Sequence, residues 1–116
     1  MALTIPKNEW IKKTYEYRRV YEKGRRYHGD YIILFALNNS LNYSRMGISV
    51  GKKIGGSVKR NRIKRLIREI VRHMWADVVK EKDIVIVAKK EAAGIELKTL
   101  WADTERVFKK AGLLRL

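Results

Sequence analysis

Hydrophobic residues fall into short runs with the spacing of β-strands. Over residues 31–37 both alternating sets of positions are apolar, which is typical of a strand covered on both faces. Residues 84–88, IVIVA, form a continuous apolar run that predicts a buried strand. A short additional strand near residues 25–29 stays open as an alternative.

A further strand is predicted over residues 46–51, and its two faces differ. The bulky positions are Met46, Ile48 and Val50, and the positions between them are Gly47, Ser49 and Gly51. Nearly bare backbone on one face of a strand indicates that another group approaches it closely.

The first stretch with helical spacing covers residues 7–23. Pro6 can occupy its first turn, where a backbone N–H is not needed, and Gly24 is a suitable C-terminal stop. At about 100° per residue, one face of this helix carries Trp10, Thr14, Tyr17 and Tyr21.

Two more amphipathic helices are predicted, over residues 58–79 and 97–111. Ser57 is a suitable N-cap for the first of them, and Gly112 closes the second. The apolar stripe of the first consists of Ile63, Leu66, Ile67, Ile70 and Met74. This order of helices and strands indicates an α+β fold or a split α/β sandwich.

The length of 116 residues favours a single domain, residues 1–116. Without cysteine the chain has no disulfide, thiolate metal site or Cys nucleophile. The longest apolar run is too short to span a bilayer, and MALTIPKNEW at the start lacks the apolar core of a secretory signal. We therefore expect a soluble, cytoplasmic protein that does not engage membranes.

The charge of the chain points to an anionic partner. There are 27 Lys and Arg against 12 Asp and Glu, and 27 − 12 gives a net charge of +15. Residues 1–72 hold 18 − 5, or +13, whereas residues 73–116 hold 9 − 7, or +2. We expect the partner to meet mainly the first two-thirds of the chain.

The strongest single feature is the segment 52–72, KKIGGSVKRNRIKRLIREIVR. Nine of its 21 residues are Lys or Arg, and only Glu69 is acidic. An ordinary solvated helix face mixes both signs of charge, so we interpret this helix as anion-binding rather than as a bland surface. The side opposite the apolar stripe carries Asn61, Lys64, Arg65, Arg68 and Arg72.

The residue types on this side suit RNA. The forked guanidinium of arginine binds two phosphate oxygens at once. The Asn61 side chain can both donate and accept, as contacts to base edges and 2′-hydroxyls require.

Residues for catalysis are sparse. His28 and His73 are the only histidines, and neither has the neighbours of a catalytic triad. Asp30, Asp77 and Asp83 are expected at separate, loop-like positions, so no carboxylate cluster suggests a two-metal site. The glycines near residue 55 lack the spacing of a phosphate-binding loop. We predict no catalytic residue and no metal or cofactor held by protein side chains.

A set of aromatic residues leaves two interpretations open. Tyr17 and Tyr21 lie four residues apart on the first helix, and Ile33 and Phe35 share one face of the first long strand. Composition favours core packing. The alternative is a groove in which unpaired bases stack on the rings, and the tyrosine hydroxyls, which need water or a partner, suit that alternative.

The segment GISVGKKIGGSVKRNRIKRLIRE, residues 47–69, resembles the signature of the bacterial ribonuclease P protein subunit. The hallmark Arg-Asn-Arg of that family corresponds to Arg60, Asn61 and Arg62. Upstream, YEYRRVYEKG resembles the family's aromatic-x-x-V-aromatic-x-x-G helix end. Downstream, KDIVIVAKK resembles the strand before its last helix. The resemblance covers nearly the whole chain.

The resemblance implies a fold like the second domain of ribosomal protein S5. That fold is an α-β sandwich of order αβββαβα, with a left-handed βαβ crossover that carries the Arg-Asn-Arg helix. Residue spacing says nothing about handedness, and a right-handed connection would be the default.

The resemblance also implies the function of a noncatalytic subunit of a ribonucleoprotein endoribonuclease. In such an enzyme the RNA subunit holds the catalytic Mg²⁺. The protein binds that RNA and the 5′ leader of precursor tRNA, whose removal makes the mature 5′ end. No protein oligomer is required.

Two sets of residues correspond to the family's binding surfaces. The RNA-facing set is Lys52, Lys53, Arg60, Asn61, Arg62, Lys64, Arg65, Arg68 and Arg72. The leader-cleft set is Tyr17, Tyr21, Ile33, Phe35, Ser49, Lys89 and Lys90. The two helix positions of the cleft are usually Phe in the family and are Tyr here, which leaves the leader preference open.

Two other functions compete with this one. A structural RNA-binding protein of S5-like ribosomal fold is the main alternative, but a scaffold has no need of a leader cleft. A protein nuclease that acts alone is the third candidate, and the missing catalytic constellation argues against it.

Overall fold

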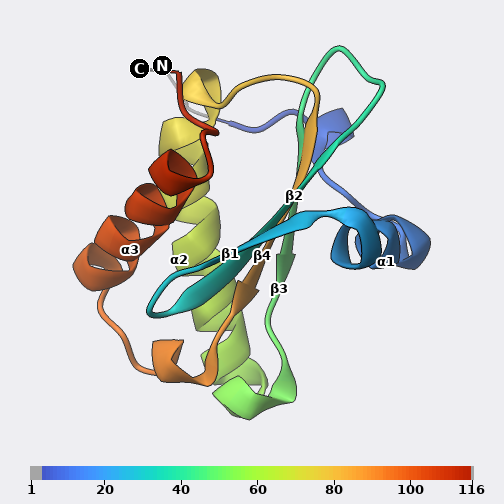
Figure 1. Ribbon diagram of the computed structural model, residues 1–116. Helices are drawn as coiled ribbons and strands as arrows, with labels where there is room; N and C mark the ends of the chain where they lie inside the picture. Colours follow the sequence, from blue (N-terminus) through green and yellow to red (C-terminus); the bar gives the residue numbers. More distant parts are fainter. Residues whose placement is uncertain (1–3, 116) are drawn as a thin grey trace.

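The computed structural model describes residues 4–115. The expectation that the first ten residues contain no secretory signal therefore lies partly outside the described residues. Short 3₁₀ turns, η1–η4, cover Lys7–Glu9, Lys52–Ile54, Trp75–Asp77 and Lys90–Ala92. The main elements, in chain order, are α1 (Thr14–Lys23), β1 (Arg25–His28), β2 (Ile32–Asn38), β3 (Arg45–Ser49), α2 (Ser57–Met74), β4 (Lys82–Ala88) and α3 (Leu97–Lys110). The predicted order αβββαβα is confirmed, including the short strand near residue 25 (Figure 1).

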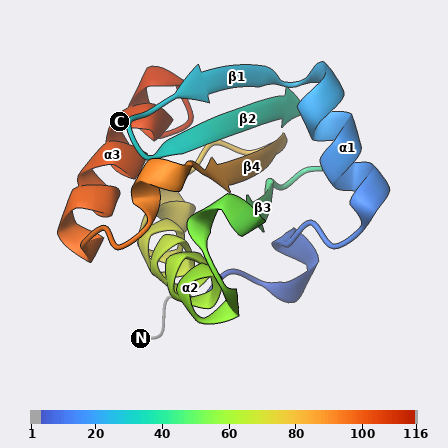
Figure 2. The same ribbon diagram turned by 90° about the horizontal axis from the view of Figure 1, so that it is seen from below.

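The four strands form one mixed sheet in the order β1-β2-β4-β3. β2 pairs antiparallel with β1 and β4, whereas β3 runs parallel to β4. A parallel pair needs a crossover connection, and α2 provides it between β3 and β4. Figures 1 and 2 show that this crossover is left-handed, as the resemblance implied and against the usual right-handed rule.

The larger core lies between the sheet and the pair α2 and α3. Its side chains with at most 1 % exposure include Ile32, Leu34, Met46, Ile63, Ile67, Ile70, Ile84, Ile86, Leu100 and Phe108. The predicted stripe of α2 is confirmed apart from Leu66, which is only half-buried. Each buried aliphatic side chain contributes about 1.5–3 kcal/mol, so this layer supplies most of the stability.

A smaller core lies on the other face of the sheet, beneath α1. It consists of Ile11, Val20 and Val85, with half-buried neighbours Tyr17, Tyr21, Phe35, Leu37 and Val87. The prediction of a central strand covered on both faces is thereby confirmed. Figure 1 shows α1 on this side of the sheet, opposite α2 and α3.

The predicted helix over residues 7–23 is wrong in its first half. The helix begins at Thr14, and Trp10 forms a parallel β-bridge with Met46 instead. The Ile11 amide donates to the Met46 carbonyl at 2.8 Å, which holds this segment against the sheet edge. The helical spacing of Trp10 with the tyrosines is a coincidence, because Trp10 packs against the larger core and the tyrosines pack against the smaller one.

The ends of α2 also differ from the prediction. The helix begins at Ser57 with Gly56 as its N-cap, so Ser57 is not the capping residue. It ends at Met74 rather than near Val79, because Val78 and Val79 pair with the C-terminal segment. Val78 forms an antiparallel bridge with Leu114, and the Val79 N–H donates to the Leu113 carbonyl at 2.8 Å.

Asp83 is not at a loop position. It lies within β4, is 1 % exposed and forms an ion pair with Arg45. Within residues 4–115 no helix is long and apolar enough to cross a membrane.

Candidate nucleic-acid interface

The outward face of α2 is a surface of cations with few acidic partners. Asn61, Arg65 and Arg68 are exposed there, and Lys64 and Arg72 are half-buried at its edges. Lys52 and Lys53 are exposed on η2, just before the helix. We call these residues, together with Arg60 and Arg62, the basic face. Seven of the predicted RNA-facing residues thus lie together on exposed or half-exposed ground.

Arg60 and Arg62 are less accessible than their place in the sequence motif suggests. Both are half-buried, and Arg62 donates to the Ile95 carbonyl at 2.8 Å. Within the described residues, Arg60 Nε and Arg62 Nη1 are buried without an acceptor. Asn61, between them, points outward. In the Arg-Asn-Arg motif, the two arginine side chains are therefore partly buried against the protein, and the Asn61 amide lies on the surface.

The single acid of the basic segment is neutralised locally. Glu69 accepts from Arg72 Nε at 2.9 Å and contacts His73 Nε2 at the same distance. These hydrogen bonds lower the pKa of Glu69, and the bond to Glu69 raises the pKa of Arg72. Glu69 therefore offsets positive charge only near the C-terminal end of α2. Among the described residues, Arg65 and Arg68 form no ion pair that would offset their charge.

On the opposite side of the sheet, α1 brings three predicted rings together. The Tyr17 and Tyr21 centroids are 6.4 Å apart, and Tyr21 meets Phe35 edge-on at 5.0 Å. Tyr17 also covers the bare part of β3: a Cβ at Gly47 would lie 2.7 Å from its Cε1. The group expected to approach this bare strand is therefore the Tyr17 ring, and burial raises the pKa of its hydroxyl.

The other predicted cleft residues continue this surface beyond α1. Ile33 and Ser49 flank Val87 from either side in the sheet register, and both are half-buried. We call Tyr17, Tyr21, Ile33, Phe35 and Ser49 the aromatic face. Lys89 stands at its end and donates to the Gly29 carbonyl at 3.2 Å. Lys90 is exposed on η4.

Sequence reasoning missed Arg26. It is paired with Phe35 in the β1–β2 register, and its guanidinium lies 5.7 Å from the centre of the Phe35 ring. It is exposed, so a cation stands beside the rings of the aromatic face. Treating the optional strand 25–29 as real and pairing it with residues 31–37 would have suggested this neighbour.

Sequence reasoning also missed the ion cluster that ties α1 to the sheet. Arg45 donates through Nε and Nη2 to Asp83 at 2.9 and 2.7 Å, and through Nη1 to Glu16 at 2.7 Å. Glu16 precedes Tyr17, and Arg45 lies two residues before Gly47. The cluster therefore fixes the helix at the point where its first ring meets β3.

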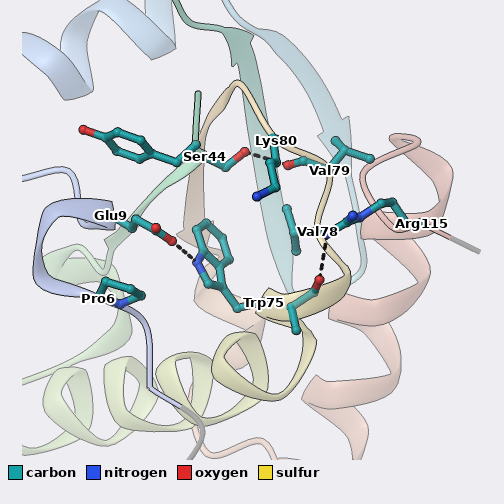
Figure 3. Close-up of a pocket in the computed structure, with 10 residues that line it drawn as sticks. Pro6, Glu9, Ser44, Trp75, Val78, Val79, Lys80 and Arg115 are labelled. Carbon is teal, nitrogen blue, oxygen red and sulfur yellow. Dashed lines mark hydrogen bonds between the residues drawn. The ribbon is translucent and has the colours of Figure 1, made fainter. Parts of the chain in front are cut away.

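Figure 3 shows a pocket lined by none of the predicted residues. It lies where η1, η3 and the end of the chain meet. Several of its polar groups bond within the lining: Trp75 Nε1 donates to Glu9 Oε1 at 2.7 Å, and Arg115 donates to the Ala76 carbonyl at 2.9 Å. In residues 4–115 no three His, Cys, Asp or Glu side chains gather as a metal site would require.

The sequence is similar to one family over nearly its whole length. A family model described as Ribonuclease P matches residues 5–112. The ribonuclease P protein component of Natranaerobius thermophilus is 42 % identical over 90 % of this chain and 91 % of its own length. That of Clostridium novyi is 39 % identical over 94 % of this chain and 98 % of its own.

Solved structures resemble this one in fold and sequence. A Staphylococcus aureus RNase P protein mutant with defective mRNA degradation activity superposes with a TM-score of 0.87 at 33 % identity, covering 93 % of this chain and 92 % of its own. The Thermotoga maritima RNase P protein gives a TM-score of 0.80 at 25 % identity, covering 88 % and 96 %.

Proposed function

The chain belongs to the ribonuclease P protein family, and from that premise we propose how its two surfaces divide the work. A ribonuclease P protein component is part of a ribonucleoprotein endoribonuclease that processes tRNA, with an RNA subunit as its partner. The relatives carry this name rather than that of a ribosomal protein, which argues against the scaffold alternative.

The basic face binds the RNA subunit in this proposal. The observation that carries it is the run of exposed cations on α2, of which Arg65 and Arg68 have no acidic partner among the described residues. Unpaired arginines release counterions when they meet phosphates. Asn61 adds a contact that can read a base edge or a 2′-hydroxyl.

The aromatic face binds the unpaired 5′ leader of precursor tRNA. Its rings are half-buried rather than fully covered, and Ile33 and Ser49 extend the surface past the end of α1. Bases without a pairing partner stack on such rings with little sequence preference. Arg26 beside Phe35, together with Lys89 and Lys90, would hold the leader backbone.

Cleavage itself belongs to the RNA subunit, which we propose holds the catalytic Mg²⁺. The described residues offer no cluster of metal ligands, and the histidines His28 and His73 lie on different elements. In this proposal the protein works in the cytoplasm and requires no protein oligomer. Its contribution is to hold the leader and the RNA subunit in register.

The test is cleavage of precursor tRNA by a bacterial ribonuclease P RNA at low Mg²⁺, with and without this chain. We expect the chain to raise the rate with the RNA present and to show no activity alone, on either precursor tRNA or an mRNA. The mRNA arm is included because of the activity named for the Staphylococcus aureus protein. Robust cleavage of precursor tRNA by RNA-free protein, after controls for contaminating nuclease, would contradict the proposal.

The salt dependence of RNA binding is a second test. If about six phosphates are neutralised, affinity falls by orders of magnitude between low and moderate salt. A nearly flat plot of log affinity against log salt would exclude the basic face as the principal contact.

A further inference from the structure

Trp10 stands at the edge of the basic face, although its neighbour Ile11 packs beneath α1 on the opposite side of the sheet. The 3₁₀ turn η1 and the bridge to Met46 carry it across to the α2 side of the sheet. There it packs against the larger core while staying half-buried. One edge of the indole is therefore anchored, and another remains open beside α2.

Arg68 lies over this ring. Its guanidinium carbon is 5.5 Å from the centre of the Trp10 ring. Arg68 is exposed and, within residues 4–115, it is not part of any ion pair, in contrast to Arg72, which pairs with Glu69. A planar cation held on an indole without an anion keeps its full charge and one free stacking face.

The ring and the guanidinium line an open pocket. Its other walls are Thr4, Ile5 and Arg72, and its volume is about 450 Å³. This is within the roughly 300–1,000 Å³ typical of small-ligand sites. The combination of an apolar wall, an aromatic ring and two arginines matches a flat heterocycle attached to a phosphate, which is a nucleotide.

We propose that Trp10 and Arg68 form a binding site for one unpaired nucleobase of the RNA subunit. The base stacks on the indole–guanidinium pair, and its phosphate meets the charge of Arg68 and Arg72. This inference rests on the proposed function, since it assumes that the basic face meets the RNA subunit. It gives the protein a second stacking site, on the opposite side of the sheet from Tyr17 and Phe35.

Two substitutions at Trp10 separate stacking from packing. Trp10→Phe keeps a ring, and Trp10→Leu keeps apolar volume without one. We expect Trp10→Phe to bind the ribonuclease P RNA within about twofold of the native chain, and Trp10→Leu to bind it roughly 5- to 150-fold more weakly, the range for one stacked base. Both should bind heparin, a polyanion without bases, as the native chain does.

Arg68→Lys provides the variant that does not depend on folding of the Trp10 region. It keeps the positive charge on an exposed helix position but removes the planar guanidinium on which a base would stack. Affinity for the RNA should therefore fall, while affinity for heparin should stay the same. Trp101→Leu is the matched control, because Trp101 is also half-buried but lies on α3, beside His73 at 5.1 Å. It should change neither affinity.

The outcomes are distinguishable. Native affinity in both Trp10→Leu and Arg68→Lys, or equal losses for RNA and heparin, would overturn the stacking site. Arg65→Gln tests, in the same assay, the premise that the basic face binds the RNA subunit. If Arg65→Gln leaves RNA affinity unchanged, that premise is wrong. If Arg65→Gln weakens RNA binding while Trp10→Leu binds like the native chain, the nucleobase site alone is rejected.

Discussion

On the α1 side of the sheet, Arg45 is held by two carboxylates, whereas on the α2 side Arg65 and Arg68 have none among the described residues. The α1 side combines rings from one helix and one strand, α1 and β2, with a cluster in which one arginine pairs with two carboxylates. The α2 side presents charge outward from a single helix. The first arrangement fixes a shape, and the second keeps electrostatic free energy available for a partner.

Because of this difference, mutation of a cation should mainly reduce folding stability on the α1 side and mainly reduce RNA binding on the α2 side. A cation in a closed cluster contributes to folding, because its removal strands a buried carboxylate. An exposed cation without a partner contributes to binding and hardly to folding. The two sides of the sheet should therefore respond oppositely when stability and RNA affinity are measured together.

The largest expected effect is on the α1 side, from Arg45→Ala. It leaves Asp83, 1 % exposed, without its ion-pair partner, although the Asn39 side-chain amide still donates to it at 2.8 Å, and should lower the free energy of unfolding by about 3–5 kcal/mol. Urea unfolding measures it. The double substitution Arg45→Ala with Asp83→Ala should recover part of the loss, since the buried Asp83 carboxylate is then gone and the half-buried Glu16 is the carboxylate left without its arginine. A loss below about 1 kcal/mol in the single variant would mean that the cluster does not hold the helix.

The next effect separates the two faces of α2 itself. Ile67→Ala opens a cavity beneath a fully buried side chain and should cost roughly 2–5 kcal/mol. Arg65→Ala and Arg68→Ala should leave the melting temperature nearly unchanged but weaken binding to the RNA subunit. If the arginine variants melt as early as Ile67→Ala, the assignment of the two faces is incorrect.

Much of this division is visible in the sequence, for physical reasons. A helix repeats its faces every few residues, so the Ile63–Ile70 stripe and the charges opposite it could be predicted from spacing alone. Gly47 signalled a close approach, and Tyr17 is the group that makes it. These are local patterns whose meaning does not depend on distant parts of the chain.

Other features depend on contacts between distant segments. Trp10 has helical spacing with Tyr17, yet its pairing with Met46 takes it to the other side of the sheet. Asp83 looks like a residue before a strand until Arg45, 38 positions away, is seen to hold it inside. The handedness of the β3–α2–β4 crossover likewise has no signature in residue spacing.

The third effect concerns ligand choice rather than stability. Phe35→Ala or Tyr17→Ala should weaken binding of the holoenzyme to precursor tRNA by about 1–3 kcal/mol per lost stacked base, and leave mature tRNA nearly unchanged. Tyr15→Ala is the matched control, because Tyr15 is 63 % exposed on the same helix and outside the aromatic face. Equal losses for precursor and mature tRNA would assign the rings to core packing.

The smallest effect is a pH dependence of stability from Glu16. Burial acts to raise the pKa of this carboxyl, but hydrogen bonds from Arg45 and from the Lys13 amide outweigh it and hold the pKa below its ordinary value. Because the folded pKa is lower than the unfolded one, the carboxylate stabilises the fold above its ordinary pKa, and this stabilisation is lost as the pH falls through the lowered folded value.

Glu16→Gln removes that titration and keeps an oxygen that can accept from Arg45 and Lys13. We expect it to lower stability at pH 7 by roughly 1 kcal/mol and to make the curve of unfolding free energy against pH less steep on the acid side. Glu69→Gln is the comparison from the basic face, where the pKa is also lowered but the side chain is 37 % exposed. Its curve should follow that of the native chain more closely, because solvent screens an exposed pair. The same slope in both variants would mean that the charge cluster under α1 is no more closed to water than the surface of α2.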